Sequence, residues 1–264
     1  VDLLKNIATE RVISEFLKLI CGKDAVKILD AYRETIAVII PEITVMFNFN
    51  QNNIHHSYDL WQHTLTALGT IEPNPILRMT MLLHDIGKPS VKTTDNSGQS
   101  HFQGHQLESK KIADRILHRL RLPSDFINKT LLLIEYHDVR FNGSKKLMKK
   151  VMNVLGTDLT KQLLEVEYAD ISAQSEYQRE EKLGYLKTAK THLNEIIKDN
   201  ECFKLSQLDI NGKDVLNLGV KEGRDVGNIL DYLLMLVVDA NVPNKKSILI
   251  SKAKEYIYGN QINK

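Results

Sequence analysis

Apolar residues recur every three or four positions along most of the chain, which is the spacing of helices with one buried face. Residues 7–20 show this spacing without interruption, so the chain is predicted to begin as a helix. A second helix is predicted over residues 24–39, and Pro41 ends it because proline cannot continue a helix. The loop of residues 48–57 is rich in Asn and His and marks the first boundary.

The rest of the pattern is helical too, with one exception. A short hairpin is predicted over residues 91–102, where Asn96, Ser97 and Gly98 supply a turn. The helical pattern of residues 159–198 is longer than the usual length of about 8 to 20 residues, so a break is expected at Gly184. The other predicted helices cover residues 58–70, 75–85, 106–119, 124–138, 145–155, 205–218, 225–238 and 245–258. The sequence therefore predicts an all-α fold.

Composition sets few further limits. The chain has 264 residues, of which 42% are hydrophobic and 26% charged, as is ordinary for a globular protein. Its net charge of +2 is too small to indicate nucleic-acid binding by itself. Cys21 and Cys202 match no metal or redox spacing, so a cytoplasmic protein with reduced cysteines is expected. No apolar run approaches the roughly 20 residues of a membrane span, so no membrane partner is expected.

The strongest local feature is the sequence His84-Asp85-Ile86-Gly87-Lys88, which follows an apolar run at residues 79–83. A polar pair at the end of a buried helix needs partners, because unpaired buried charge is expensive. A divalent metal is the natural partner, since imidazole and carboxylate are suitable ligands for Zn, Mn, Fe or Ni. Taken alone, such a pair is as often a helix cap or a surface feature.

Other residues of the kinds that bind metals follow at intervals of one or two helix lengths. A helical bundle can bring residues at such intervals to one point, as it does in di-metal proteins. The resulting set of six candidate ligands is His63, His84, Asp85, His105, His137 and Asp170.

These residues resemble the signature of the HD superfamily of metal-dependent phosphohydrolases: a His, a later His-Asp pair and a distant Asp on a helical bundle. The resemblance implies that His63, His84 and Asp170 hold one ion, with Asp85 bridging to a second. His105 and His137 match the positions that bind the second ion in members with two metals. If only one ion binds, these two histidines are expected to contact phosphate instead. The implied cofactor is one or two divalent ions (Mn, Fe, Ni, Mg or Zn).

The resemblance also implies a catalytic set of Asp85, Lys88 and His101. Lys88 lies three residues after the bridging acid and is expected to stabilise the charge that develops on phosphoryl oxygens. His101 is expected to position the phosphate or to protonate the leaving oxygen. The implied substrate is a nucleotide or another phosphate ester, including cyclic phosphates and RNA ends.

A narrower resemblance extends over most of the chain. The segments His84 to Pro89 and His101 to His105 look like the HD domains attached to bacterial CCA-adding tRNA nucleotidyltransferases. Residues 7–16 resemble the neck of those enzymes, and residues 208–234 resemble the tail that helps to hold the tRNA. The implied domains are an N-terminal helical region (1–55), an HD phosphohydrolase domain (56–180) and a helical tail-like region that is a candidate for RNA binding (181–264).

The chain departs from these enzymes in one respect, because the Asp-x-Asp pair of the nucleotidyltransferase head occurs nowhere in it. Three functions therefore stay open. The first is an HD-type phosphohydrolase. The second is the tRNA-binding C-terminal part of a CCA-adding enzyme that has no transferase activity by itself and works with a separate head. The third is an RNA- or nucleotide-sensing scaffold with a structural metal site.

Two basic clusters are candidates for contact with RNA phosphates, although solvated helix faces often have this composition. The first contains Lys145, Lys146, Lys149 and Lys150, and the second contains Lys110, Lys111, Arg115, Arg119 and Arg121. His55 and His56 lie in the polar loop and are expected at the surface, where the loop could border the cleft.

Overall fold

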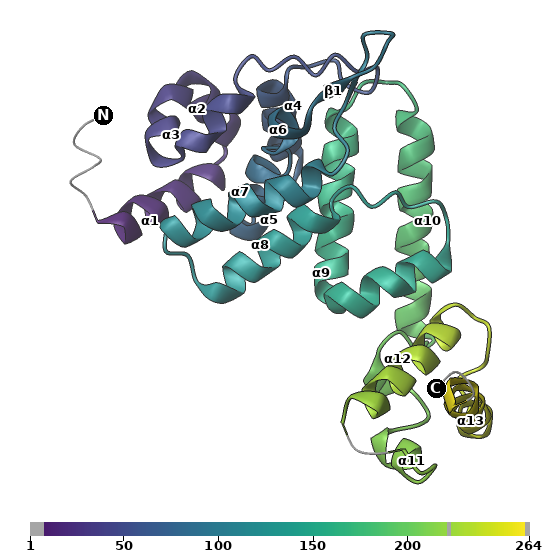
Figure 1. Cartoon of the computed structure of the whole chain (residues 1–264). Coiled ribbons are helices and arrows are strands. Elements are labelled where there is room, and N and C mark those ends of the chain that lie inside the picture. The colour runs from purple at the N-terminus through teal and green to yellow at the C-terminus, as the bar shows by residue number, and fades with distance from the viewer. Residues whose placement is uncertain (1–7, 221–222, 262–264) are drawn as a thin grey trace. The chain divides into compact units, whose positions relative to one another are not determined.

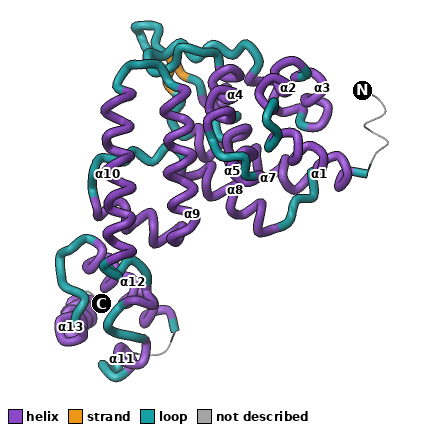
Figure 2. Tube along the Cα trace, turned by 180° about the vertical axis from the view of Figure 1, so that it is seen from behind, coloured by secondary structure: helices purple, strands orange, loops and turns teal. Residues whose placement is uncertain are grey.

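The described part of the chain is α-helical apart from one short hairpin, which confirms the predicted fold class (Figure 2). The computed structural model describes residues 8–220 and 223–261. Ile7, where the first predicted helix and the neck resemblance begin, lies outside the described residues. The same holds for the start of the predicted N-terminal region (1–7) and for residues 221–222 and 262–264 of the predicted tail-like region. No described helix combines the length and the apolar character needed to cross a membrane.

The chain forms two compact units. The first takes residues up to 140 and residues 158–186. Within it, α7 lies along α8, and α8 in turn packs against α5 (Figure 1). Its complete elements are α1 (Thr9–Ile20), α2 (Ala25–Ala31), α3 (Arg33–Ile39), η2 (Pro41–Met46), α4 (Leu60–Thr70), α5 (Pro75–Leu83), α6 (Lys88–Val91), β1 (Thr93–Thr94), β2 (Ser100–His101), α7 (His105–Arg119) and α8 (Ser124–Tyr136). Two long helices, α9 (Lys145–Ala173) and α10 (Arg179–Lys198), contribute residues to both units.

Polar caps fix where α4 and α5 begin. The Asp59 carboxylate accepts a hydrogen bond from the backbone N–H of Gln62, which starts α4. Asn74 caps α5 in the same way, and Pro75 occupies the first helical position, where its missing N–H costs nothing. These caps fix the first residue of each helix, and with it the position of His63 within α4 and of His84 at the end of α5.

The helix breaks differ from the sequence expectation at two places. Residues 24–39 form two helices, because the backbone leaves helical geometry at Tyr32. The break expected at Gly184 is wrong: Gly184 lies inside α10, and the chain turns at residues 174–178 instead. Hydrogen bonds from Ser175 to the polar loop of residues 48–57 hold this turn. The pattern of apolar residues could not predict these bonds. Gly156, at φ 70°, separates the two helical stretches within α9.

The predicted hairpin is confirmed. Thr93 pairs with His101 and Thr94 with Ser100 in an antiparallel register. Asp95 closes the turn, because its carboxylate accepts hydrogen bonds from the backbone N–H groups of Ser97 and Gln99.

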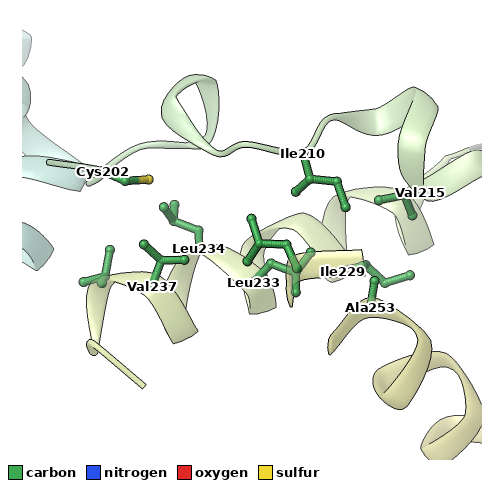
Figure 3. Packing of buried hydrophobic residues seen from close by; sticks show 10 residues of the cluster. Cys202, Ile210, Val215, Ile229, Leu233, Leu234, Val237 and Ala253 are labelled. Atoms are coloured by element: carbon green, nitrogen blue, oxygen red, sulfur yellow. The ribbon is translucent and has the colours of Figure 1, made fainter. Parts of the chain in front are cut away.

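The second unit takes residues 141–157 and residues from 187 onward. Beyond its parts of α9 and α10, its described elements are η3 (Leu205–Gln207), α11 (Gly212–Leu216), α12 (Arg224–Val238) and α13 (Lys246–Gln261). Figure 3 shows its core, where Ile210 and Val215 face Ile229 and Leu233 of α12. The side chains of Leu233, Val215 and Leu249 are fully buried, so α12 is the central helix of this core.

Acidic residues of the same unit neutralise the first basic cluster. Lys145 and Lys149 place their Nζ atoms 2.5 and 2.7 Å from the two oxygens of Glu201. Lys146 and Lys150 lie 3.0 and 3.1 Å from Asp239 Oδ1. A structural role therefore accounts for these four lysines, and their predicted contact with RNA stays a prediction.

The second basic cluster is also largely paired. Lys110 lies 2.6 Å from Glu135, Arg119 lies 2.6 Å from Glu42, and Arg121 lies 2.7 Å from Glu10. These are exposed or half-exposed pairs, so they contribute little stability, but they reduce the local positive charge.

Replacing Leu233 by alanine should lower the free energy of unfolding of the second unit by about 2 to 5 kcal/mol, because it leaves a cavity in the centre of its core. Met235→Ala, on the exposed side of the same helix, is the matched control and should cost less than about 1 kcal/mol. Urea unfolding followed by circular dichroism measures both. Equal losses for the two variants would show that α12 is not packed as described.

Candidate metal centre

Four of the six predicted ligands meet in one cluster at the ends of α4 and α5 and on α9. His63 Nε2 lies 2.9 Å from Asp170 Oδ1 and 3.5 Å from Asp85 Oδ2. His84 Nε2 lies 3.2 Å from Asp85 Oδ2 and 3.5 Å from Asp170 Oδ1. The side chains of His63 and His84 are fully buried and that of Asp85 is 1% exposed, while Asp170 reaches the group from the edge.

The other two predicted ligands form a second cluster that shares Asp85. His105 Nε2 lies 3.2 Å and His137 Nε2 3.5 Å from Asp85 Oδ1. Asp85 thus turns one oxygen toward each cluster. The structure brings together all six residues that the sequence singled out as ligands.

Backbone carbonyls orient all four histidines of the two clusters. In each ring, Nδ1 lies within hydrogen-bond distance of a carbonyl: Ala173 for His63, Met81 for His84, Phe102 for His105 and Ile134 for His137. A carbonyl can only accept, so Nδ1 carries a proton and Nε2 is the nitrogen turned toward the centre. This is the arrangement in which proteins hold metal-binding histidines.

Several of the inward-facing atoms lack a hydrogen-bond partner of the protein's own. His84 Nε2 and Asp85 Oδ1 are buried without a hydrogen bond, which would be costly if nothing bound there. His105 Nε2 and His137 Nε2 face each other at a distance of 3.1 Å. Converging imidazole nitrogens and carboxylate oxygens are the donor set of a divalent transition metal, so these residues fit the predicted cofactor.

The pKa shifts of the site residues also fit a bound cation. Burial by itself lowers the pKa of His84, but the negative charges of Asp85 and Asp170 outweigh it and raise the pKa to about 10. Burial likewise opposes the ionisation of Asp85 and Asp170, yet the neighbouring histidines hold the pKa of both carboxyls well below its usual value. The site therefore favours two carboxylates together with positive charge between them.

Lys88 lies beside Asp85 and is almost fully buried. Its Nζ is 2.6 Å from Asp85 Oδ2, and it donates a hydrogen bond to Gln51 Oε1 at 3.0 Å. The turn that carries it packs tightly on α7: a Cβ at Gly87 would come within 2.5 Å of the backbone nitrogen of Ser109. Only glycine allows this close approach.

His101 is placed apart from the other predicted catalytic residues. Its side chain is half exposed on β2, and Nε2 lies 2.8 Å from Asp95 Oδ2 on the same hairpin. In the described part of the chain, the candidate metal-binding groups do not include it.

Sequence reasoning missed several residues that support the site. His56 was expected at the surface, but its ring packs at 5.0 Å against that of His63, and its Nε2 lies 3.4 Å from Lys88 Nζ. Burial and the charge of Lys88 lower the pKa of His56 to about 2, so it is neutral at physiological pH. Gln174 donates a hydrogen bond to the outer oxygen of Asp170 at 2.8 Å. The sequence offered one signal for this contact: Gln174 comes four residues after Asp170 in a segment predicted to be helical.

Two family models match the chain. Residues 105–253 match the model described as tRNA nucleotidyltransferase domain 2. Residues 1–47 match a family described as "Probable RNA and SrmB- binding site of polymerase A".

Curated relatives come from the same group of proteins. The chain is 29% identical over 251 residues to the CC-adding tRNA nucleotidyltransferase of Thermus thermophilus, covering 90% of this chain and 55% of that protein. It is 30% identical over 142 residues to the A-adding tRNA nucleotidyltransferase of Deinococcus radiodurans, covering 50% of this chain and 32% of that protein. With the multifunctional CCA protein of Legionella pneumophila (strain Paris) it shares 27% identity over 161 residues, which are 56% of this chain and 38% of that protein. The chain thus spans about half or less of the length of these relatives.

A buried acid near the site should make stability depend on pH. Glu167 is 6% exposed, and burial together with the charges of Asp170 and Asp138 raises its pKa well above the usual 4.5. The folded protein therefore keeps a proton that the unfolded chain has already lost. The stability from this group is complete below pH 4.5 and is lost as the pH rises toward the folded-state pKa.

Glu167→Gln, which cannot ionise, should remove this dependence. Relative to the variant, the wild-type protein should lose at least about 1 kcal/mol of unfolding free energy between about pH 5 and pH 8. Urea unfolding of both proteins across this range measures the difference. A difference that does not change with pH would mean that Glu167 is ionised in the folded state.

Proposed function

Because the chain belongs to the tRNA nucleotidyltransferase domain 2 family, we propose that it is a tRNA-binding part of an enzyme related to the CC- and A-adding nucleotidyltransferases. The match of residues 1–47 to an RNA-binding family supports the same function. No Asp-x-Asp pair occurs in the 264 residues, so we propose that this chain does not add nucleotides by itself and that a nucleotidyltransferase head supplies that step. In this proposal, residues 1–55 and 181–264 are the RNA-binding regions on either side of an HD domain at 56–180.

One observation favours a second function of the same chain, metal-dependent hydrolysis of a phosphate ester. It is the pair of clusters that share the buried carboxylate of Asp85, with four Nε2 atoms turned inward. His63, His84, Asp85 and Asp170 would hold one divalent ion, and Asp85, His105 and His137 a second. Such ions supply Lewis acidity toward phosphoryl oxygens and activate water for attack on phosphorus.

The protein groups around the clusters suit this chemistry. Lys88 brings a positive charge next to Asp85, where it can bind the non-bridging oxygens of a phosphate. Gln51 holds the ammonium group in place from the buried side. His101 would contact only a substrate that extends over the hairpin. A nucleotide, a cyclic phosphate or an RNA end would be the substrate.

Fluorescence anisotropy with labelled tRNA tests the first function. The chain should bind tRNA with an affinity that falls steeply as salt rises, because phosphate contacts release counterions. Incubation with CTP, ATP and Mg²⁺ should add no nucleotide to a tRNA that lacks its 3′ end. A chain that fails to bind tRNA at low salt, or that extends it unaided, would contradict the proposal.

The Asp85→Ala variant tests the second function. Wild-type protein purified without chelators should carry about two divalent ions per chain and hydrolyse a generic phosphodiester or phosphomonoester. Asp85→Ala removes the shared ligand, so it should lose bound metal and hydrolysis while keeping its affinity for tRNA. Asp158→Ala, which changes an exposed acid outside both clusters, is the matched control. Absence of metal and of metal-stimulated turnover in the wild-type protein would refute the hydrolase function and leave tRNA binding untouched.

A further inference from the structure

A second group of side chains lies directly beside Asp170. Lys182, on α10, donates a hydrogen bond to Gln174 Oε1 at 2.6 Å, and Gln174 in turn donates to Asp170 Oδ2 at 2.8 Å. Lys182 Nζ also lies 3.4 Å from His55 Nδ1. An ammonium group has three N–H donors, so at least one is left for a ligand. Two hydrogen bonds, both made by Gln174, thus link the lysine to Asp170 of the candidate metal centre.

Arg140 adds a second positive charge at the same place. Its charge acts on both His55 and Lys182 and lowers the pKa of each. Arg140 is exposed, and within residues 8–220 and 223–261 no acidic side chain forms an ion pair with it. Asp170, Asp138 and Glu167 act on Lys182 in the opposite sense, so these acids compete with a ligand for its charge.

An aromatic ring packs against His55, the neighbour of Lys182. Tyr177 is 48% exposed, and its ring lies 5.0 Å from that of His55 at an angle of 58°. One side of the tyrosine ring is therefore supported by protein while much of its surface stays open. Exposed aromatic rings next to cations are the usual means of binding single-stranded nucleotides, because every base has a face that can stack.

The segment that carries Tyr177 is held in place. The backbone N–H of Ser175 donates to the carbonyl of His55 at 2.8 Å, and the Ser175 hydroxyl donates to the carbonyl of Ile54 at 2.6 Å. Arg179 donates to the carbonyl of Gln174 from the other end of the turn. A ligand that binds here does not have to order the loop first.

We propose that Arg140, Lys182 and Tyr177 form a nucleotide-binding subsite beside the candidate metal centre. The two cations bind a phosphate next to the one that is cleaved, and the tyrosine ring stacks on a base. The substrate class is then an oligonucleotide end with at least two phosphates. The choice of cleaved phosphate rests on the proposed hydrolase function, but binding to the subsite does not.

Binding in the presence of EDTA tests the subsite without turnover. The probes are 5′-phosphorylated diadenylate, which has two phosphates and two bases, and adenosine 5′-monophosphate, both titrated by calorimetry into the full chain. Wild-type protein should bind the dinucleotide about tenfold or more tightly than the mononucleotide. Arg140→Ala and Tyr177→Leu should each remove most of this preference, whereas Tyr177→Phe, which keeps the ring, should retain it.

Two exposed residues of the same unit that lie outside the proposed RNA-binding regions provide matched controls, Lys161→Ala for the charge and Tyr58→Leu for the ring. Both should keep the wild-type preference. Equal affinity of the wild-type protein for the two probes, or an unchanged preference in Arg140→Ala and Tyr177→Leu, would overturn the subsite. Hydrolysis of p-nitrophenyl phosphate with added Mn²⁺ is measured separately. If this hydrolysis is absent while the dinucleotide preference depends on Arg140 and Tyr177, the hydrolase function fails and the subsite stands.

Discussion

An ionised carboxylate costs several kcal/mol to bury unless positive groups and hydrogen bonds surround it. Asp85 is such a carboxylate, and the arrangement around it follows from that cost. It lies just beyond the end of α5, where the backbone is released from the helix, and histidines from four different helix ends or starts face its two oxygens. Lys88 adds a fixed charge. The helices of the first unit are therefore tied together at their polar ends as well as by their apolar faces.

The helical pattern could be predicted from the sequence because most helices bury one face, and their caps and prolines mark where they start. The six candidate ligand positions could be singled out because His and Asp residues recur at intervals of one or two helix lengths and resemble a known signature. The catalytic role of His101 stays a prediction. Its pairing with Asp95 is a contact within the hairpin, which spacing along the chain does not reveal.

What the sequence could not show depends on contacts between distant segments. Ser175 breaks the long helical pattern only because the polar loop offers carbonyls for it to bind. His56 is drawn toward His63 by the fold around the site, although its own segment reads as a surface loop. Likewise, the lysines of α9 look like an RNA-binding surface until Glu201 and Asp239 are seen beside them. The partners of Ser175 and of these lysines lie far away along the chain, and no local pattern indicates them.

The first unit is discontinuous in sequence, because residues 141–157 belong to the second unit and interrupt it before Asp170. Its candidate ligand residues therefore do not lie in one contiguous segment of the sequence. Recombination at the boundary after Arg140 would carry five of the six candidate ligand residues and leave Asp170 behind. A gene fusion or deletion at that point would separate the candidate metal-binding residues even though it cut between compact units. Modular exchange of this centre in evolution thus requires that both segments travel together, with the intervening helix of the neighbouring unit between them.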